Sequence, residues 1–182
     1  MSDNATSQDT ESDSRWEAST LTALVGHLLR HHHPYTKTAL IELAPLLDKV
    51  VRVHGEQHAE LHELNKLFAE LHDDMDMHLM KEENILFPYM LALESDSPPA
   101  AQFGTVANPI RMMMMEHEHD SLILNKMLEI TSHFTLPPGA CTSFTALYAG
   151  LHDLVNDLLQ HIRLENDIVF PKAIATEKHL RK

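Results

Sequence analysis

Apolar residues recur at spacings of three and four along most of the chain, the period of a helix that buries one face. The pattern predicts four long helices, over residues 34–54, 58–93, 109–133 and 140–175. A shorter apolar stretch after Trp16 predicts an extra N-terminal helix that ends at the corner His31–Pro34. Breaks rich in proline, serine and glycine separate the long helices. The predicted fold is therefore all-α, an up-down-up-down four-helix bundle with a short extra N-terminal helix.

Residues 1–15 differ from the rest because they are polar and acidic and have no apolar period. They predict a disordered acidic leader, followed by one domain over residues 16–182. The 27 acidic residues outnumber the 14 basic ones, which argues against partners such as nucleic acid or an anionic membrane. We find no signal peptide and no apolar run long enough to span a membrane. A single cysteine, Cys141, excludes an internal disulfide and suits the cytoplasm.

Two segments, His78–Pro88 and His161–Pro171, follow the same order of residues. Each has a histidine, a glutamate four positions later, an Asn or Asp beside an isoleucine, and a final Phe-Pro. Residues four apart lie on one face of a helix, so each histidine points the same way as its glutamate. One such pair is common by chance, but two with the same ending indicate an internal duplication.

Each copy also has a histidine on the helix predicted before it. His33 lies 45 residues before His78, and His117 lies 44 residues before His161. In a bundle these positions converge, which would place four histidines and two glutamates in the core, a set typical of two iron or manganese ions. Without metal, the buried carboxylates would repel each other, and each unpaired polar group would cost about 1–3 kcal/mol. The candidate metal ligands are His33, His78, Glu82, His117, His161 and Glu165.

The segment Glu116–Asp120 contains two histidines, so the choice of ligand there is open. Counting from Pro109 and from Cys141 favours His117, as does the duplication, and His119 is the alternative. The flanking glutamates are candidates for accepting a hydrogen bond from a ligand or for lining a proton or iron path. The run Met112–Met115 is interpreted as core filling, since four consecutive residues spread around a helix.

The same positions carry a family resemblance. The chain resembles the hemerythrin-like di-iron domain of the Repair-of-Iron-Centres proteins from about Leu21 to Ala173. The matching segments are His32–Tyr35, Val53–Gly55, His78–Pro88, Pro109-Ile110, Met115–Glu118, Ala140-Cys141, Ala146–Tyr148, His161–Asn166 and Phe170-Pro171. Carried over position by position, the ligands of the family fall on the same six candidate residues. The resemblance implies two iron ions in an oxo- and carboxylate-bridged di-iron centre.

The resemblance also implies a role in the stress response. A protein of this family helps to repair iron-sulfur clusters damaged by nitric oxide or peroxide, here as an iron donor more than as a classical enzyme, with iron-sulfur proteins as clients. Family members commonly carry an N-terminal cysteine module, and its function is expected to be absent here or supplied by another protein.

The alternatives are a reversible carrier or sensor of O2 or NO, and a di-iron NO reductase or peroxidase. The oxygen-carrying hemerythrins replace one glutamate by a fifth histidine, whereas both halves here have His-x-x-x-Glu, which favours the repair type. A monomer or homodimer is expected.

Overall fold

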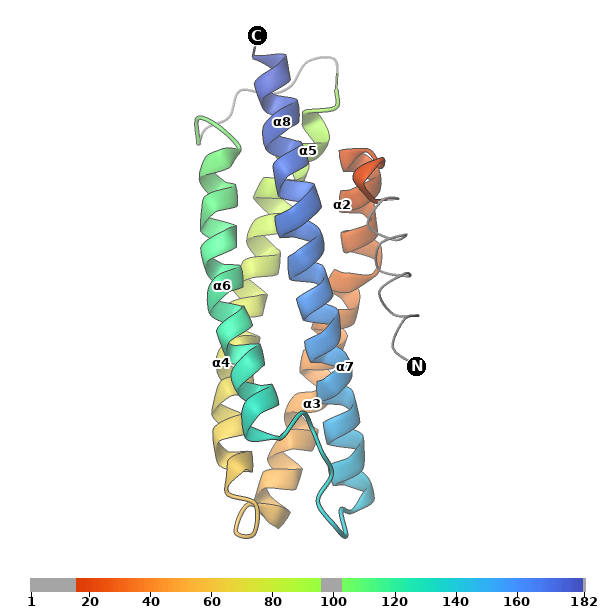
Figure 1. The fold of residues 1–182 in the computed structure, drawn as a ribbon, viewed down its shortest axis with the longest axis vertical. Helices are drawn as coiled ribbons and strands as arrows, with labels where there is room; N and C mark the ends of the chain where they lie inside the picture. The colour runs from red at the N-terminus through yellow and green to blue at the C-terminus, as the bar shows by residue number, and fades with distance from the viewer. Residues whose placement is uncertain (1–15, 96–102, 182) are drawn as a thin grey trace, which may run out of the picture.

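The computed structural model describes residues 16–95 and 103–181, and within them every regular element is helical (Figure 1). The predicted leader, residues 1–15, lies outside the described residues. The prediction of an all-α bundle is confirmed. No helix in the described part of the chain combines the length and apolarity needed to cross a bilayer.

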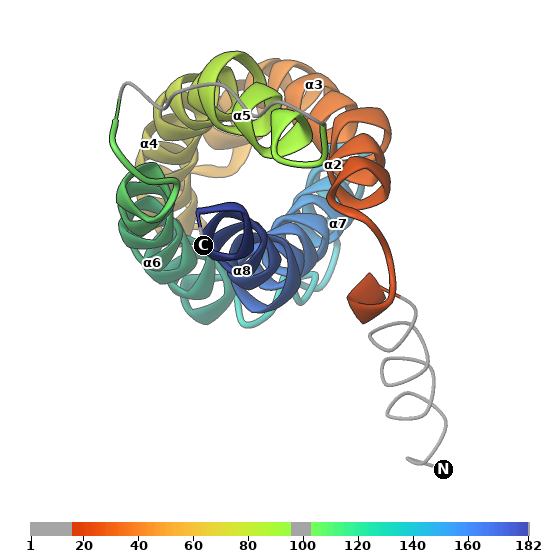
Figure 2. The same cartoon turned by 90° about the horizontal axis from the view of Figure 1, so that it is seen from above.

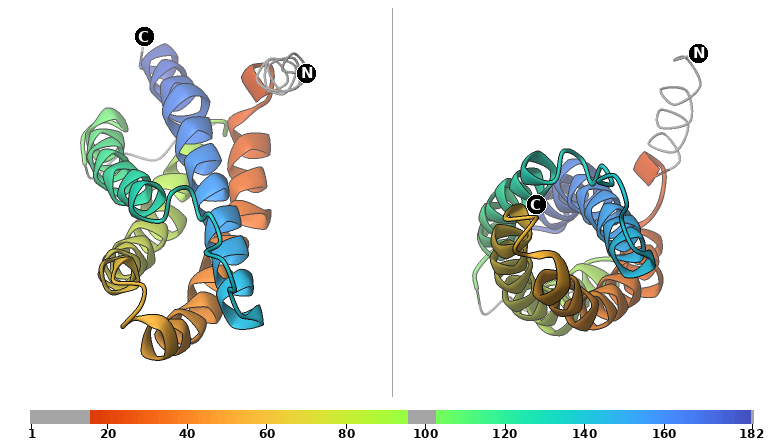
Figure 3. Two further views of the ribbon diagram at one scale, coloured as in Figure 1. Left: turned by 60° about the horizontal axis from the view of Figure 1, so that its bottom comes forward. Right: turned by 90° about the horizontal axis from the view of Figure 1, so that it is seen from below.

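Four long helical segments, called staves below, run alternately down and up the bundle (Figure 1). Seen along the length of the bundle, they close into a ring (Figures 2 and 3). In chain order the staves are α2 (Leu21–Arg30) with α3 (His32–His54), then α4 (Glu60–Lys81), η1 (Glu82–Leu86) and α5 (Phe87–Ala92), then α6 (Ala107–Ile130), and last α7 (Thr142–Leu164), η2 (Glu165–Val169) and α8 (Phe170–Leu180). The elements η1 and η2 are π-helices. Segments far apart in the sequence therefore lie side by side around one axis.

Several helix ends differ from the predicted ones. Helix α3 begins at His32 rather than residue 34, because a proline is tolerated in the first turn, where its missing N–H has no partner to lose. Helix α6 ends at Ile130, three residues early, since Ser132, His133 and Phe134 have φ angles of 49°, 55° and 55° and form a left-handed turn. Helix α8 continues to Leu180, past the predicted end at residue 175.

The predicted N-terminal helix is α2, and only His31 separates it from α3. Its apolar side is fully buried, and its first turn is capped twice. The Thr20 hydroxyl accepts a hydrogen bond from the backbone N–H of Ala23. The Glu94 carboxylate, beyond α5, accepts from the N–H groups of Leu21 and Thr22 at 2.7 and 2.9 Å. These contacts fix α2 above α3, as the upper part of the first stave (Figure 1).

Buried apolar side chains form two clusters, one above the other along the bundle. The lower cluster joins α3, α4, α6 and α7 and includes Leu64, Leu124 and Leu151. The upper cluster joins α2, α5 and α8 with the start of α6 and includes Phe87 and Phe170. Each stave passes from one cluster to the other through a short segment that carries buried polar residues. The fold therefore holds a polar layer between two apolar ones.

Candidate metal centre

All six predicted ligands lie in this polar layer. The side chains of His33 on α3, His117 on α6 and the two His/Glu pairs of the other staves are at most 2 % exposed. Each histidine of a pair is in the last turn of an α-helix, and each glutamate is the first residue of the π-helix that follows. The structure therefore brings together, from all four staves, the residues that the duplication selected.

The six side chains form two overlapping groups. The first group is His33 and His161 with the two glutamates, and the second group is His78 and His117 with the same two glutamates; the donor atoms of each group lie within 4.8 Å of one another. The Glu82 Oε2 atom is 3.5 Å from His33 Nε2 and 3.4 Å from His78 Nε2. Glu165 likewise approaches His161 at 3.1 Å and His117 at 3.2 Å. Both glutamates therefore belong to both groups.

The π-helices follow from the repeated Phe-Pro. A proline has no N–H, and its ring would clash with the carbonyl four residues back, so an ordinary α-turn is unfavourable at Pro88 and Pro171. The N–H of Phe87 instead donates to the carbonyl of Glu82, and that of Phe170 to Glu165, five residues back in each case. The sequence predicted one long helix over each of these stretches, and the structure is helical throughout both; the π-turns within them were not predicted. Such π-turns are frequent at functional sites, and here one begins at each glutamate.

Three of the four imidazoles have a hydrogen-bond acceptor at their Nδ1 atom. The Nδ1 atoms of His33, His78 and His117 lie 2.9, 3.0 and 2.9 Å from side-chain oxygens of Glu83, Glu116 and Asn166. An acceptor at Nδ1 fixes the proton there and leaves Nε2 free to bind a metal. The predicted role of a glutamate beside His117 as an acceptor fits Glu116, which also pairs with Lys81.

The fourth imidazole, His161, is different. Its Nδ1 atom is buried and makes no hydrogen bond to any residue the structure describes. Its ring instead stacks on His32, with centroids 5.4 Å apart and planes inclined by 24°. His32 is buried and lies 3.0 Å from a carboxylate oxygen of Asp157. His32 was not singled out from the sequence, because its neighbour His33 matched the spacing.

Burial and neighbouring charges set the protonation of the centre. Burial, followed by the charge of His161, lowers the pKa of His33 to about 4. Burial alone would lower the pKa of His78, but the negative charges of Glu82 and Glu165 outweigh burial and raise the pKa of His78 to about 10. Burial and the charge of Glu165 raise the pKa of Glu82. For Glu165 burial would raise the pKa, but the charges of His161 and His117 outweigh burial and lower the pKa well below its usual value. Burial and neighbouring charges therefore compete in setting the protonation of this layer.

The donor set fits a pair of divalent cations. The carboxylate oxygens of Glu82 and Glu165 and the Nε2 atoms of His33 and His161 are buried, and none makes a hydrogen bond to a described residue. Each unpaired buried polar group costs about 1–3 kcal/mol, so a cation that binds them removes a substantial penalty. Imidazole and carboxylate ligands together suit iron, manganese or zinc. None of the six residues in the two groups is a cysteine, which argues against a structural zinc site.

The alternative histidine lies on the surface. His119 is 53 % exposed and pairs with Glu70 at 3.2 Å and Asp74 at 3.5 Å. Asp120, in contrast, is buried, and burial raises its pKa to about 6; sequence reasoning missed it. Core filling by the methionine run holds only for Met113, since the other three are 45–59 % exposed.

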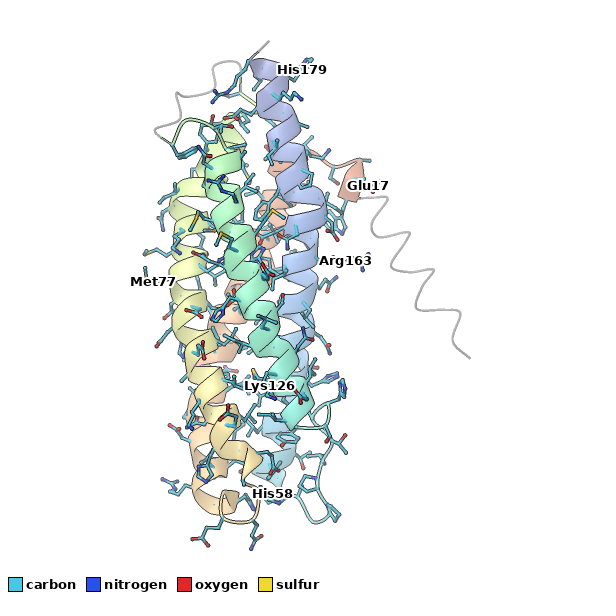
Figure 4. All side chains as sticks on the ribbon, turned by 60° about the vertical axis from the view of Figure 1, so that its left-hand side comes forward. Glu17, His58, Met77, Lys126, Arg163 and His179 are labelled. Atoms are coloured by element: carbon cyan, nitrogen blue, oxygen red, sulfur yellow. The ribbon has the colours of Figure 1, made fainter. Side chains whose placement is uncertain are left out.

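Two surface pockets lie beside the layer, one lined by α4 and α6 and the other by α2 and α7. These two pairs of helices are on opposite sides of the ring of helices in Figure 2. A pocket of about 290 Å³ between α4 and α6 has His78 itself in its wall, together with Met77, which points outward from α4 in Figure 4. A pocket of about 540 Å³ beside α2 and α7 is lined by Trp16 and His32, among others. There His32 stands between the pocket and His161.

An all-α bundle with a buried histidine and glutamate layer at its centre defines a hemerythrin-like protein. The chain matches the family described as the hemerythrin HHE cation binding domain over residues 13–173, and it belongs to that family. It is also similar to proteins named iron-sulfur cluster repair protein YtfE. The relative from Cronobacter sakazakii is 34 % identical over 170 residues, 93 % of this chain and 73 % of the relative. The relative from Escherichia coli O81 is 34 % identical over 162 residues, 89 % and 70 % of the two chains.

Proposed function

We propose that this protein is a non-haem di-iron protein that repairs iron-sulfur clusters damaged by nitrosative or oxidative stress, with iron-sulfur proteins as clients and iron as its cargo. The observation that carries the proposal is the sharing of Glu82 and Glu165 by two buried histidine groups. The name of the relatives, iron-sulfur cluster repair protein, gives the direction of the chemistry. A cytoplasmic location remains a prediction.

In this proposal His33 and His161 would hold one iron, His78 and His117 would hold the other, and the two glutamates would contribute to both. Bound iron supplies redox chemistry and affinity for small molecules. The chain supplies the rest: Glu83, Glu116 and Asn166 orient three imidazoles, and the apolar clusters above and below exclude water.

Shared carboxylates also suit the release of one ion. When one iron leaves, Glu82 and Glu165 remain bound to the other, so neither carboxylate is left unpaired in the buried layer. The stave ends stay packed by the two apolar clusters, which do not depend on the metal. The bundle can therefore give up one ion without unfolding, as an iron donor must.

The test is a repair assay. A cluster enzyme inactivated by nitric oxide is mixed with the iron-loaded protein, and recovered activity is compared with that obtained from the same concentration of free Fe(II). We expect faster and more complete recovery with the protein, and the His119→Ala variant, changed only at the surface, to behave like the unmodified chain. Recovery no better than with free Fe(II) would remove the repair function.

A reversible carrier or sensor of O2 or NO is the second candidate. The pocket of about 290 Å³ that reaches His78 favours it, since a diatomic molecule has room to approach the layer there. An oxygenated absorbance spectrum that survives repeated cycles of deoxygenation would support the carrier, whereas steady turnover of NO or peroxide with a reductant would indicate an enzyme.

A further inference from the structure

The duplication lets each half of the centre serve as a reference for the other. His33 corresponds to His117, 84 positions later, and His78 corresponds to His161, 83 positions later. The acceptors behind the single histidines also correspond. Glu83 holds His33, Asn166 holds His117, and these two lie 83 positions apart. On this side of the layer the two halves are built alike.

The correspondence breaks behind the other two histidines. Glu116 accepts from His78 at 3.0 Å, and the residue 84 positions earlier, where the same acceptor for His161 would lie, is His32. A stacked imidazole thus replaces a carboxylate, and Nδ1 of His161 has no hydrogen-bond partner among the described residues. The same shift relates buried Asp120 to buried Thr36, so a second acidic side chain is also missing from that half.

An acceptor behind a metal-bound imidazole orients the ring and raises its basicity, and losing one typically weakens metal binding about 10–100-fold. In the second group both histidines have such an acceptor. In the first group only His33 has one. Two acidic side chains, the half-buried Glu116 and the buried Asp120, further favour a cation in the second group.

We propose that the two ions are unequal: the ion of the first group, held by His33 and His161, is the labile one that the protein delivers, and the ion of the second group is retained. This inference rests on the proposed di-iron function. The larger pocket, of about 540 Å³, lies next to His32 and so beside the weakly held ligand His161, which gives the departing ion a nearby way to solvent.

The experiment measures release of iron. The full chain is loaded anaerobically with Fe(II), mixed with an excess of a chromogenic ferrous chelator, and followed by absorbance. We expect two phases of equal amplitude whose rate constants differ about tenfold or more, in line with the usual effect of an outer acceptor. A single phase that releases two irons per chain would overturn the inference and leave the di-iron proposal intact.

Two variants assign the phases. His32→Glu places a carboxylate where Glu116 lies in the other half, and should slow the fast phase about tenfold without changing the slow one. Glu116→Ala removes the acceptor behind His78, so it should speed the slow phase about tenfold and leave the fast one. The matched controls are His31→Glu and Glu118→Ala, which make the same changes at exposed neighbouring positions and should alter neither phase.

The opposite pattern is equally clear. If Glu116→Ala accelerates the fast phase, the labile ion belongs to the second group and the inference is wrong. Because a buried charge at position 32 risks unfolding the metal-free chain, His32→Gln offers a neutral acceptor for His161, and circular dichroism before loading checks that each variant is helical. Failure of cluster repair despite biphasic release would contradict the proposed function alone.

Discussion

Glu82→Gln tests the centre most directly, because it should act in opposite directions with and without metal. The substitution keeps the size of the side chain and removes its charge. In the metal-free protein the surroundings of Glu82 disfavour that charge, since burial and Glu165 raise its pKa. The same carboxylate belongs to both donor groups, so in the proposed metal-loaded protein it would bind both ions.

The size of each effect follows from the geometry. The donor oxygens of Glu82 and Glu165 lie within 4.8 Å of each other, and at an effective dielectric constant of about 20 two negative charges at that distance repel by about 3 kcal/mol. The metal-free variant should therefore gain up to about 3 kcal/mol in free energy of unfolding. Free metal at about 100 times Kd stabilises the native chain by about 2.7 kcal/mol per site, and the variant should lose this for both sites.

The assay is urea unfolding followed by circular dichroism, with and without added Fe(II) under anaerobic conditions, together with metal analysis. The control is Glu63→Gln, an exposed position on the same stave, which should change neither curve by more than about 0.5 kcal/mol. Equal destabilisation of both forms by Glu82→Gln would show that Glu82 supports packing only. Two tightly bound irons in the variant would show that it is no ligand.

Three further outcomes are expected. His117→Ala should lower the bound iron to one per chain or fewer, whereas His119→Ala, at the exposed site, should leave it unchanged by metal analysis. Glu177→Gln should cost about 2 kcal/mol at pH 7, because the buried carboxylate accepts hydrogen bonds from the hydroxyl of Tyr89 and from the backbone N–H of Val106, the residue before α6. Its hydrogen bonds lower the pKa of Glu177 below 4.5 in the folded state, so its stabilisation is present above that pH and is lost on acidification; the gap between the variant and the unmodified chain should close in urea titrations below pH 4.5. Leu64→Ala, in the lower cluster, should cost about 2–5 kcal/mol, with unchanged iron content in the folded fraction.

The sequence predicted which residues gather in the polar layer, because helical spacing decides which side chains share a face. A histidine and a glutamate four apart must share a helix face, and the duplication repeats the constraint in an independent stretch of sequence. The choice of His117 over His119 also followed from counting, and the structure places His117 in the layer and His119 on the surface. Helix ends were less predictable, as at Ile130, where three residues with positive φ are not glycines.

Features that depend on packing between staves were missed. Nothing in the local pattern distinguishes Glu116, which reaches across to His78, from Glu118, which faces water. Burial of Asp120 depends in the same way on which side of α6 faces its neighbours. The sequence contains a signal for the π-turns, because Phe-Pro follows the glutamate in both repeats. Predicting a π-turn from it requires the position of the carbonyl four residues before each proline.

The position of the layer explains why the protein keeps such an unfavourable set of groups. A single continuous apolar core would be more stable without two buried glutamates, because each raises the cost of folding unless a cation is present. By placing these groups between two apolar clusters, the chain leaves the packing of each half of the bundle largely independent of the metal. Metal affinity and fold stability can then be set separately. In the proposed di-iron form, the contrast between Glu116 and His32 would change the affinity for one ion without any change in the leucines above and below. This separation would allow a stable bundle to bind one iron tightly and the other weakly.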